Sequence, residues 1–466
     1  MRPSPLRWRR VGIRVHAVAP PGRPHRLYPP AVTPASGWPR LRARLPAERP
    51  AHATTTAHVQ AAYPFMAEGG LGSRGTYIGR DKSGGSFVYD PFVLYERGVL
   101  TNPNMVIVGE VGFRKSSLVK TMIWRDAVFG RQTWVVDPKG EYEPLAAAMG
   151  VRPVRLTPGG AVRLNPLEGH GGEQAQLALL RAVTTASLSR ALRTEEEAAL
   201  TEALRIVNRA ARERGSDPVL PDVVECLLRP EQAMATPLAT TTAALKDAAR
   251  EAALGLRRLC EGDLAGMFDA PTTVGLDVDA PLVVLDLSAL RDSTSIGILM
   301  ACAAAWLQAR VDERRHRIQA TGARADAIKL VVDEGWRVVS HIGIAEWLQQ
   351  SLKLARALGV QIVLVMHRFS DLSSAGDAGS RVAKLAEGLL SDTQTRVVYR
   401  QAPGEIEATR HLAGLTDTEA RQVLELEPGE AVWKIAGRSF HVQHILSSRE
   451  RELVNTDGAM LVRSGR

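Results

Sequence analysis

The sequence has few cysteines and no long apolar run. Its three cysteines, Cys226, Cys260 and Cys302, lack the C-x-x-C spacing of a zinc site, and they are too scattered for a disulfide framework. The stretch nearest to a membrane span, residues 296–307, is shorter than the ~20 apolar residues that a membrane helix needs. No apolar signal-peptide core is found either. We therefore expect a cytoplasmic protein without zinc or disulfides.

A net positive charge is also missing from most of the chain, although the whole sequence has a formal net charge of +9. Residues 1–50 contain eleven arginines, no lysine and one acid, Glu48, so this segment carries +10 and the remainder −1. The segment also holds eleven prolines and should be disordered, because it cannot bury enough apolar surface. It is either a basic arm for nucleic acid or anionic lipid, or the product of a start codon placed too far upstream. Charge alone therefore does not support DNA binding by the body of the protein.

The stretch NMVIVGEVGFRKSSLV, residues 104–119, combines an apolar strand, a glycine turn and the start of a helix. A P-loop requires this context, because its backbone N–H groups cradle phosphate oxygens. The spacing of Gly109, Lys115 and Ser116 fits G-x-x-x-x-G-K-[ST], in which the lysine reaches the terminal phosphates and the hydroxyl coordinates Mg²⁺. The predicted nucleotide-binding residues are Gly109, Glu110, Val111, Gly112, Phe113, Arg114, Lys115, Ser116 and Ser117.

Arg114 stands where this motif has its second glycine. Glycine lets the backbone approach phosphate without a side chain in the way. Arginine can contact phosphate through its positive charge, but it can also crowd the loop. The alternative interpretation of the stretch is a strand, turn and helix that bind nothing, so the rest of the chain must decide.

Two further strands end in acidic residues. The run TWVVDPKGE ends its strand at Asp137 and leads to Glu141, although Asp-Pro and Lys-Gly are also ordinary turn residues. The run AIKLVVDE ends in Asp333 and Glu334, which is the Walker B pattern. In that pattern the first acid holds Mg²⁺, and the second is the candidate base that orients the attacking water.

Helices alternate with these strands, and the next strand ends at His367. This order predicts an α/β fold with a mainly parallel central sheet and right-handed crossovers. It also places Gly109, Asp137, Asp333 and His367 along one edge of the sheet, where ligands bind in such folds. Residues 173–268 interrupt the pattern with helical periodicity and no visible chemistry, which predicts an all-α insertion.

Several stretches together carry a family resemblance: GEVGFRKSS, VVDPKGEY, FDAPTTVGLDVDAPLVVLDLSAL, LVVDEGW and LLSDTQTRVVYRQ. Their order is that of HerA/FtsK-type motor ATPases. Over about residues 60–450 the chain most resembles the TraC-type ATPase of conjugative type IV secretion, in its short actinobacterial form. The resemblance implies a RecA-like P-loop core in a hexameric ring that hydrolyses ATP with Mg²⁺. It further implies an inner-membrane conjugation or secretion complex as partner, at the inner face of the cytoplasmic membrane.

The resemblance also implies roles for individual residues. In such rings an arginine of the neighbouring subunit stabilises charge on the transferred phosphoryl group, and the family pattern matches it to Arg356, with Arg396 and Arg400 as rivals. His367 stands where the family usually has a glutamine that senses the γ-phosphate, and a neutral imidazole can still make one such hydrogen bond. The predicted site therefore has catalytic residues Glu334, Lys115, His367 and Arg356, Mg²⁺ ligands Ser116 and Asp333, and further candidates Asp137 and Glu141.

We expect five segments: a disordered tail (1–58), a β lead-in with the P-loop half of the core (59–170), the helical insertion (171–270), the Walker B half (271–450) and a C-terminal tail (451–466). Two rival functions stay open. One is a DNA-pumping translocase of the same superfamily, with DNA as a partner. The other is a degenerate, non-hydrolysing ring subunit, which Arg114 supports and the intact Lys115, Ser116, Asp333 and Glu334 oppose.

Overall fold

The computed structural model divides the chain into two units, residues 1–64 and 65–466. It describes residues 70–454 of the second unit, except 84, 169–171, 263, 274–276, 278, 291–295, 321–326, 340–341 and 371–387. The side chains of 308–319, 338–339, 342–343 and 354–358 are likewise outside the description. The predicted disordered tail (1–58) and most of the predicted C-terminal tail therefore lie outside the described residues.

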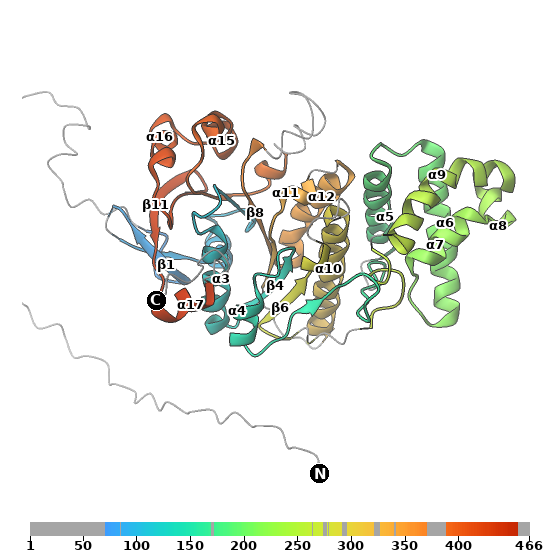
Figure 1. Cartoon of the computed structure of the whole chain (residues 1–466), viewed down its shortest axis with the longest axis horizontal. Helices are drawn as coiled ribbons and strands as arrows, with labels where there is room; N and C mark the ends of the chain where they lie inside the picture. Colours follow the sequence, from blue (N-terminus) through green and yellow to red (C-terminus); the bar gives the residue numbers. More distant parts are fainter. Residues whose placement is uncertain are drawn as a thin grey trace, which may run out of the picture. The chain divides into compact units, whose positions relative to one another are not determined.

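A mixed sheet forms the centre of the described part (Figure 1). Its eleven strands follow the order β2-β1-β11-β10-β9-β3-β8-β7-β4-β6-β5. The strands from β9 to β5 are parallel, and β10, β11, β1 and β2 extend the sheet in antiparallel fashion, which confirms the predicted α/β class. The bounds are β1 (Thr76–Asp81), β2 (Ser86–Tyr89), β3 (Met105–Val108), β4 (Gln132–Asp137), β5 (Val154–Arg155), β6 (Leu282–Asp286), β7 (Ile328–Val332), β8 (Val360–Met366), β9 (Thr395–Val398), β10 (Glu430–Ile435) and β11 (Arg438–His444).

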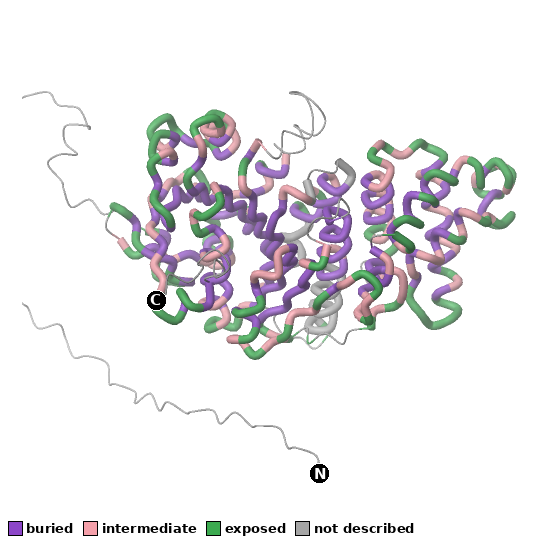
Figure 2. The backbone as a smooth tube through the Cα atoms, viewed as in Figure 1, coloured by how far each residue is buried: buried purple, intermediate pink, exposed green. Residues whose placement is uncertain are grey.

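Helices cover both faces of this sheet. Successive side chains of a strand point to opposite faces, so β3 contributes to two cores. Met105 and Ile107 pack in the core that includes α3, whereas Val106 and Val108 pack in the core that includes α10 and α12. Figure 2 shows the resulting buried strands between partly exposed helices. The helices outside the insertion are α2 (Pro91–Glu96), α3 (Lys115–Asp126), α4 (Glu143–Ala148), α10 (Ile296–Ala320), α11 (Trp336–Val339), α12 (Ile342–Leu358), α15 (Ile406–Ala413), α16 (Asp417–Glu425) and α17 (Ser448–Val454).

The predicted all-α insertion is confirmed between β5 and β6. Its first helix, α5, packs on α10 and α12, so the insertion adds a further helical layer on that face of the sheet (Figure 1). No helix among the described residues is long and apolar enough to cross a membrane. The insertion consists of α5 (Gly172–Leu188), α6 (Thr194–Arg214), α7 (Leu220–Leu228), α8 (Gln232–Ala235) and α9 (Thr242–Glu261).

Four neighbouring parallel strands, β3, β8, β7 and β4, position the predicted polar edge. Gly109 follows β3, His367 follows β8, Asp333 follows β7, and Asp137 ends β4. Because all four strands run in one direction, their carboxyl ends meet at the same edge of the sheet, as the sequence predicts.

Candidate functional site

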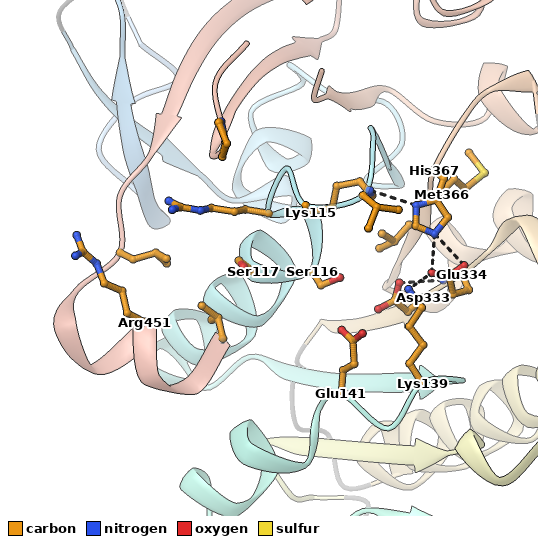
Figure 3. Close-up of a pocket in the computed structure, with 17 residues that line it drawn as sticks. Lys115, Ser116, Ser117, Lys139, Glu141, Asp333, Glu334, Met366, His367 and Arg451 are labelled. Carbon is orange, nitrogen blue, oxygen red and sulfur yellow. Dashed lines mark hydrogen bonds and ion pairs between the residues drawn. The ribbon is translucent and has the colours of Figure 1, made fainter. Parts of the chain in front are cut away.

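A pocket of about 600 Å³ opens at this edge (Figure 3). The P-loop, the turn after β4 and the ends of β7 and β8 form most of its wall, and the C-terminal segment completes it. The lining residues are Val111, Gly112, Arg114, Lys115, Ser116, Ser117, Lys139, Glu141, Asp333, Glu334, Val365, Met366, His367, Pro428, Leu446, Arg451 and Val454.

The P-loop is tied to the neighbouring strand ends by its backbone. The N–H of Gly109 donates to the carbonyl of His367 at 3.2 Å, and that of Glu110 donates to the carbonyl of Arg400 at 2.9 Å. A Cβ on Gly109 would lie 2.4 Å from the Cβ of Tyr399, so close approach of the backbones requires glycine here. Helix α3 then begins at Lys115, and its first N–H groups can serve an anion.

Arg114 has a left-handed backbone conformation, with φ 71° and ψ 27°. Glycine adopts this region freely, whereas other residues pay steric strain there. The motif's glycine is therefore explained by the backbone turn as well as by space for phosphate. The Arg114 side chain lies against Gly429, since its Cδ is 3.6 Å and its Nη1 3.5 Å from where a Cβ of that glycine would stand. It thus extends toward the start of β10.

Lys115 is buried at the base of the loop, with 6% of its surface exposed. Its Nζ donates to the carbonyls of Gly109 at 2.5 Å and Glu110 at 2.8 Å, and lies 3.4 Å from Nδ1 of His367. Burial lowers the pKa of Lys115 to about 8, against the opposing effect of the Asp333 and Glu334 carboxylates. Because a phosphate would favour the charged ammonium, this lysine is poised for an anionic ligand.

Glu334 is held by three side chains. Nε2 of His367 lies 2.9 Å from Oε1, Nε1 of Trp336 donates to Oε2 at 2.5 Å, and Nζ of Lys139 forms an ion pair with Oε1. Burial raises the pKa of Glu334, but hydrogen bonds from His367 and Lys139 outweigh it and lower that pKa to about 2. The carboxylate is therefore ionised and fully engaged by its partners.

His367 contacts both Lys115 of the P-loop and Glu334, the second acid of the Walker B pattern. Its two contacts fit a neutral imidazole whose Nε2–H donates to Glu334 and whose Nδ1 accepts from Lys115. His367, the predicted γ-phosphate sensor, thus lies beside Lys115 and Glu334, the two other residues expected near the γ-phosphate.

Asp333 and Ser116 offer the donors that Mg²⁺ prefers. Asp333 is 3% exposed, and its oxygens accept from the Glu334 N–H at 2.9 Å and from the Tyr142 hydroxyl at 3.2 Å. Burial and the neighbouring Glu334 charge raise the pKa of Asp333, so a cation beside it would be stabilising. No cluster of three or more His, Cys, Asp or Glu side chains able to hold a metal occurs within the described residues. Mg²⁺ commonly uses one or two protein ligands with phosphates and water, so this pair fits it.

The turn after β4 contributes Lys139 and Glu141 to the pocket, whereas the sequence analysis named Asp137 and Glu141 as candidates. Asp137 does not line the pocket; its carboxylate accepts backbone N–H groups of Lys139 at 3.1 Å, Gly140 at 2.9 Å and Tyr142 at 3.0 Å. Asp137 thereby fixes the turn, as in the alternative interpretation of this sequence. Glu141 does line the pocket, and its Oε2 lies 3.7 Å from Nζ of Lys120. The sequence analysis did not single out Lys139, although a cation in a turn at the predicted edge was a usable signal.

Of the three candidate arginines, Arg396 and Arg400 have described side chains, and these two bind different parts of the protein. Arg396 donates to the carbonyls of Ala413 at 3.2 Å and Leu390 at 2.9 Å, and its burial lowers its pKa. Arg400 stacks over the Phe113 ring of its own P-loop, 5.5 Å from the ring centre. Neither belongs to the described residues that line the pocket. Arg356 lies on α12, but its side chain is outside the described part, so its role stays a prediction.

The C-terminal segment forms a wall that the sequence analysis missed. Arg125 of α3 binds both oxygens of Glu450, at 2.6 and 2.7 Å, and donates to the carbonyl of Ile445 at 2.7 Å. This double ion pair fixes α17 beside the P-loop helix and brings Leu446 and Arg451 into the pocket wall. Figure 3 shows Arg451 at the end of the pocket opposite Glu334. No local sequence signal links this segment to a loop more than 300 residues upstream.

No protein-family model and no curated protein matches the sequence. The structure is similar to VirB4 of Thermoanaerobacter pseudethanolicus, with a TM-score of 0.66 and 21% identity, covering 82% of this chain and 99% of that chain. It is also similar to the plasmid coupling protein TrwB in complex with ADP and Mg²⁺ (TM-score 0.52, 13% identity, 74% and 86% covered). A third similar structure is TrwB in complex with the ATP analogue ADPNP (TM-score 0.54, 14% identity, 81% and 94% covered). Identities this low establish the fold alone, and the chain accordingly has a RecA-like α/β ATPase fold.

Proposed function

We propose that this protein binds ATP in the pocket at the sheet edge and hydrolyses it to ADP and phosphate. One observation carries the proposal: Lys115, Ser116, Asp333, Glu334 and His367, which come from three separate parts of the sequence, line one pocket. Its support from the comparisons is that the similar protein TrwB has been seen with ADP, Mg²⁺ and an ATP analogue.

Each residue has a defined task in this proposal. Lys115 contacts the β- and γ-phosphates, and the backbone N–H groups of the loop hold the remaining phosphate oxygens. Ser116 and Asp333 would hold Mg²⁺, which when bound neutralises phosphate charge and polarises the γ-phosphoryl group. Glu334 accepts a hydrogen bond from water and directs the water oxygen at the γ-phosphorus. The water oxygen bonds to the γ-phosphorus as the bond from that phosphorus to its bridging oxygen breaks. The water proton passes to Glu334 and then to solvent, and ADP leaves with inorganic phosphate.

The wider role in the proposal is that of a motor subunit in a conjugative or type IV secretion machine of the TraC type. The similarity to VirB4 and to a conjugative coupling protein supports this role. In it the chain assembles with copies of itself, as a hexameric ring, and docks at the inner face of the cytoplasmic membrane. Arg356 is the proposed arginine of the neighbouring site, and the proposed segments keep the bounds given from the sequence.

Hydrolysis of Mg·ATP by the purified full-length protein tests the proposal. We expect turnover by the natural sequence and its loss in Glu334→Gln, with nucleotide binding retained. If the natural sequence is silent and Arg114→Gly is active, the chain is a degenerate member with a structural role. If DNA strongly stimulates hydrolysis, the DNA-pumping rival gains over the secretion role.

A further inference from the structure

Lys139 is a cation of the pocket that the proposed catalytic scheme leaves without a task. It lies in the turn after β4, and its side chain rises from there to the Glu334 carboxylate (Figure 3). The side chain is 38% exposed, whereas its partner Glu334 is 4% exposed. In this ion pair Glu334 is therefore buried, whereas Lys139 has a long side chain that is open to the pocket.

The backbone that presents Lys139 is held firmly. Asp137 is buried at 1% exposure and accepts three N–H groups of the turn, including that of Lys139 itself. Movement of the ammonium therefore requires only rotation of its side chain, with no rearrangement of the loop. Rotations of partly exposed side chains are fast compared with enzymatic turnover.

Lys139 also lines the same pocket as Lys115, the lysine that would hold a γ-phosphate. A continuous chain of contacts runs from Lys115 through His367 and Glu334 to Lys139, with 3.4 Å between Lys115 Nζ and His367 Nδ1 and 2.9 Å between His367 Nε2 and Glu334 Oε1. In a P-loop the first of these residues contacts the β- and γ-phosphates. Because Lys115, Glu334 and Lys139 line one pocket, a γ-phosphate held by Lys115 would share that pocket with both Glu334 and Lys139.

Glu334 cannot easily serve water while all its partners remain. Both of its oxygens accept hydrogen bonds, and a carboxylate whose lone pairs are occupied is a weak acceptor for an additional water. Of the three partners, Lys139 is the flexible cation, and a phosphate dianion competes well for a lysine. Movement of the Lys139 ammonium from Glu334 to the γ-phosphate would free one hydrogen-bond acceptor position on Glu334.

We propose that Lys139 exchanges between Glu334 and the γ-phosphate, so that it recognises the triphosphate and releases Glu334 for the attacking water only when ATP is bound. This inference rests on the proposed ATPase function and assigns a substrate-contacting residue to it. It makes Lys139 the group by which the pocket distinguishes ATP from ADP, because ADP has no γ-phosphate to draw the lysine away.

The test measures Mg·ADPNP and Mg·ADP binding to the full-length protein by calorimetry. In Lys139→Met we expect ADPNP binding to weaken roughly 10- to 100-fold, the usual effect of losing one charged hydrogen bond, with ADP binding unchanged. Lys139→Arg should restore most of the ADPNP affinity, which shows that the charge matters and that the variant site is folded. Lys246→Met, at an exposed position of α9, removes one positive charge far from the pocket and should change neither affinity.

The Glu334→Gln variant distinguishes two roles of Lys139: direct contact with the γ-phosphate, and a purely structural role in which Lys139 only holds Glu334 in place. Removing the negative charge frees Lys139, so ADPNP should bind more tightly to Glu334→Gln, and the added Lys139→Met change should abolish that gain. Equal weakening of ADP and ADPNP in Lys139→Met, or loss of turnover with both affinities unchanged, would overturn the exchange while leaving the ATPase function intact. Failure of the natural sequence to bind either nucleotide would instead remove the proposed function, and the inference with it.

Discussion

Replacement of Arg114 by glycine is the perturbation with the clearest structural basis. The residue has φ 71° at the N-terminal boundary of α3, where its side chain makes no capping hydrogen bond. A left-handed conformation costs a residue that has a Cβ about 1–2 kcal/mol. Glycine escapes this strain but loses about 0.5–1 kcal/mol through the greater freedom of the unfolded chain. We therefore expect Arg114→Gly to match or exceed the natural sequence in stability, by at most about 1.5 kcal/mol.

Arg114→Ala is the matched control, because alanine keeps the strain and loses the side chain. The free energy of unfolding, measured by urea denaturation, should be about 1 kcal/mol higher for Arg114→Gly than for Arg114→Ala. Gly112→Ala is a second control: its φ is 86° and its added Cβ would meet no atom within 4 Å, so backbone strain alone should cost about 1–2 kcal/mol. Equal stability of the glycine and alanine variants at 114 would refute the strain argument.

The same variants decide what the arginine side chain does to the nucleotide. Since the side chain lies against Gly429, we expect the affinity for Mg·ATP to change less than about tenfold in Arg114→Gly. Hydrolysis by the natural sequence would then be compatible with the altered motif. A silent natural protein that Arg114→Gly activates would show instead that the arginine obstructs the loop.

Three further predictions concern other parts of the site and its support. Glu334→Gln should lower kcat about 100-fold or more with ADP affinity retained, measured by phosphate release and calorimetry; unchanged kcat would exclude Glu334 as the group that activates water. Gly109→Ala should destabilise the fold by about 1–3 kcal/mol in denaturant unfolding, since its Cβ would lie 2.4 Å from that of Tyr399; a neutral effect would show that the loop can shift. Burial raises the pKa of Glu450, but hydrogen bonds from Arg125 and the 447 turn outweigh it and lower that pKa to about 2. A carboxylate whose pKa is lowered in the folded state stabilises the fold at pH values above its ordinary pKa. Glu450→Gln should therefore reduce Tm at pH 7, and the difference in Tm should vanish as the pH falls from about 5 to about 2. A Tm difference that is independent of pH would contradict this ion-pair account.

Much of the site was predictable because it depends on local patterns and one topological rule. The strand Met105–Val108 and the helix α3, which begins at Lys115, match the strand, turn and helix start predicted for residues 104–119. Apolar strands that alternate with helices predict parallel neighbours, so Asp333 and His367 could be assigned to the same edge as the P-loop. The structure adds the direct contacts of His367 with Lys115 and Glu334, which no pattern of spacing specifies.

The sequence by itself determined the fold class, the helical insertion and the polar edge of the sheet, because periodicity and strand-end residues are local properties. Tertiary structure alone decided three matters. It directed the Asp137 side chain to the backbone of the turn and the Lys139 side chain to Glu334 in the pocket, since side-chain direction depends on the path of the backbone. It put Arg114 in a left-handed conformation, because the closure of the loop onto neighbouring strands sets that angle. It also brought α17 to the P-loop helix through the pairing of Arg125 and Glu450, because contacts across 325 positions depend on the packing of the whole sheet.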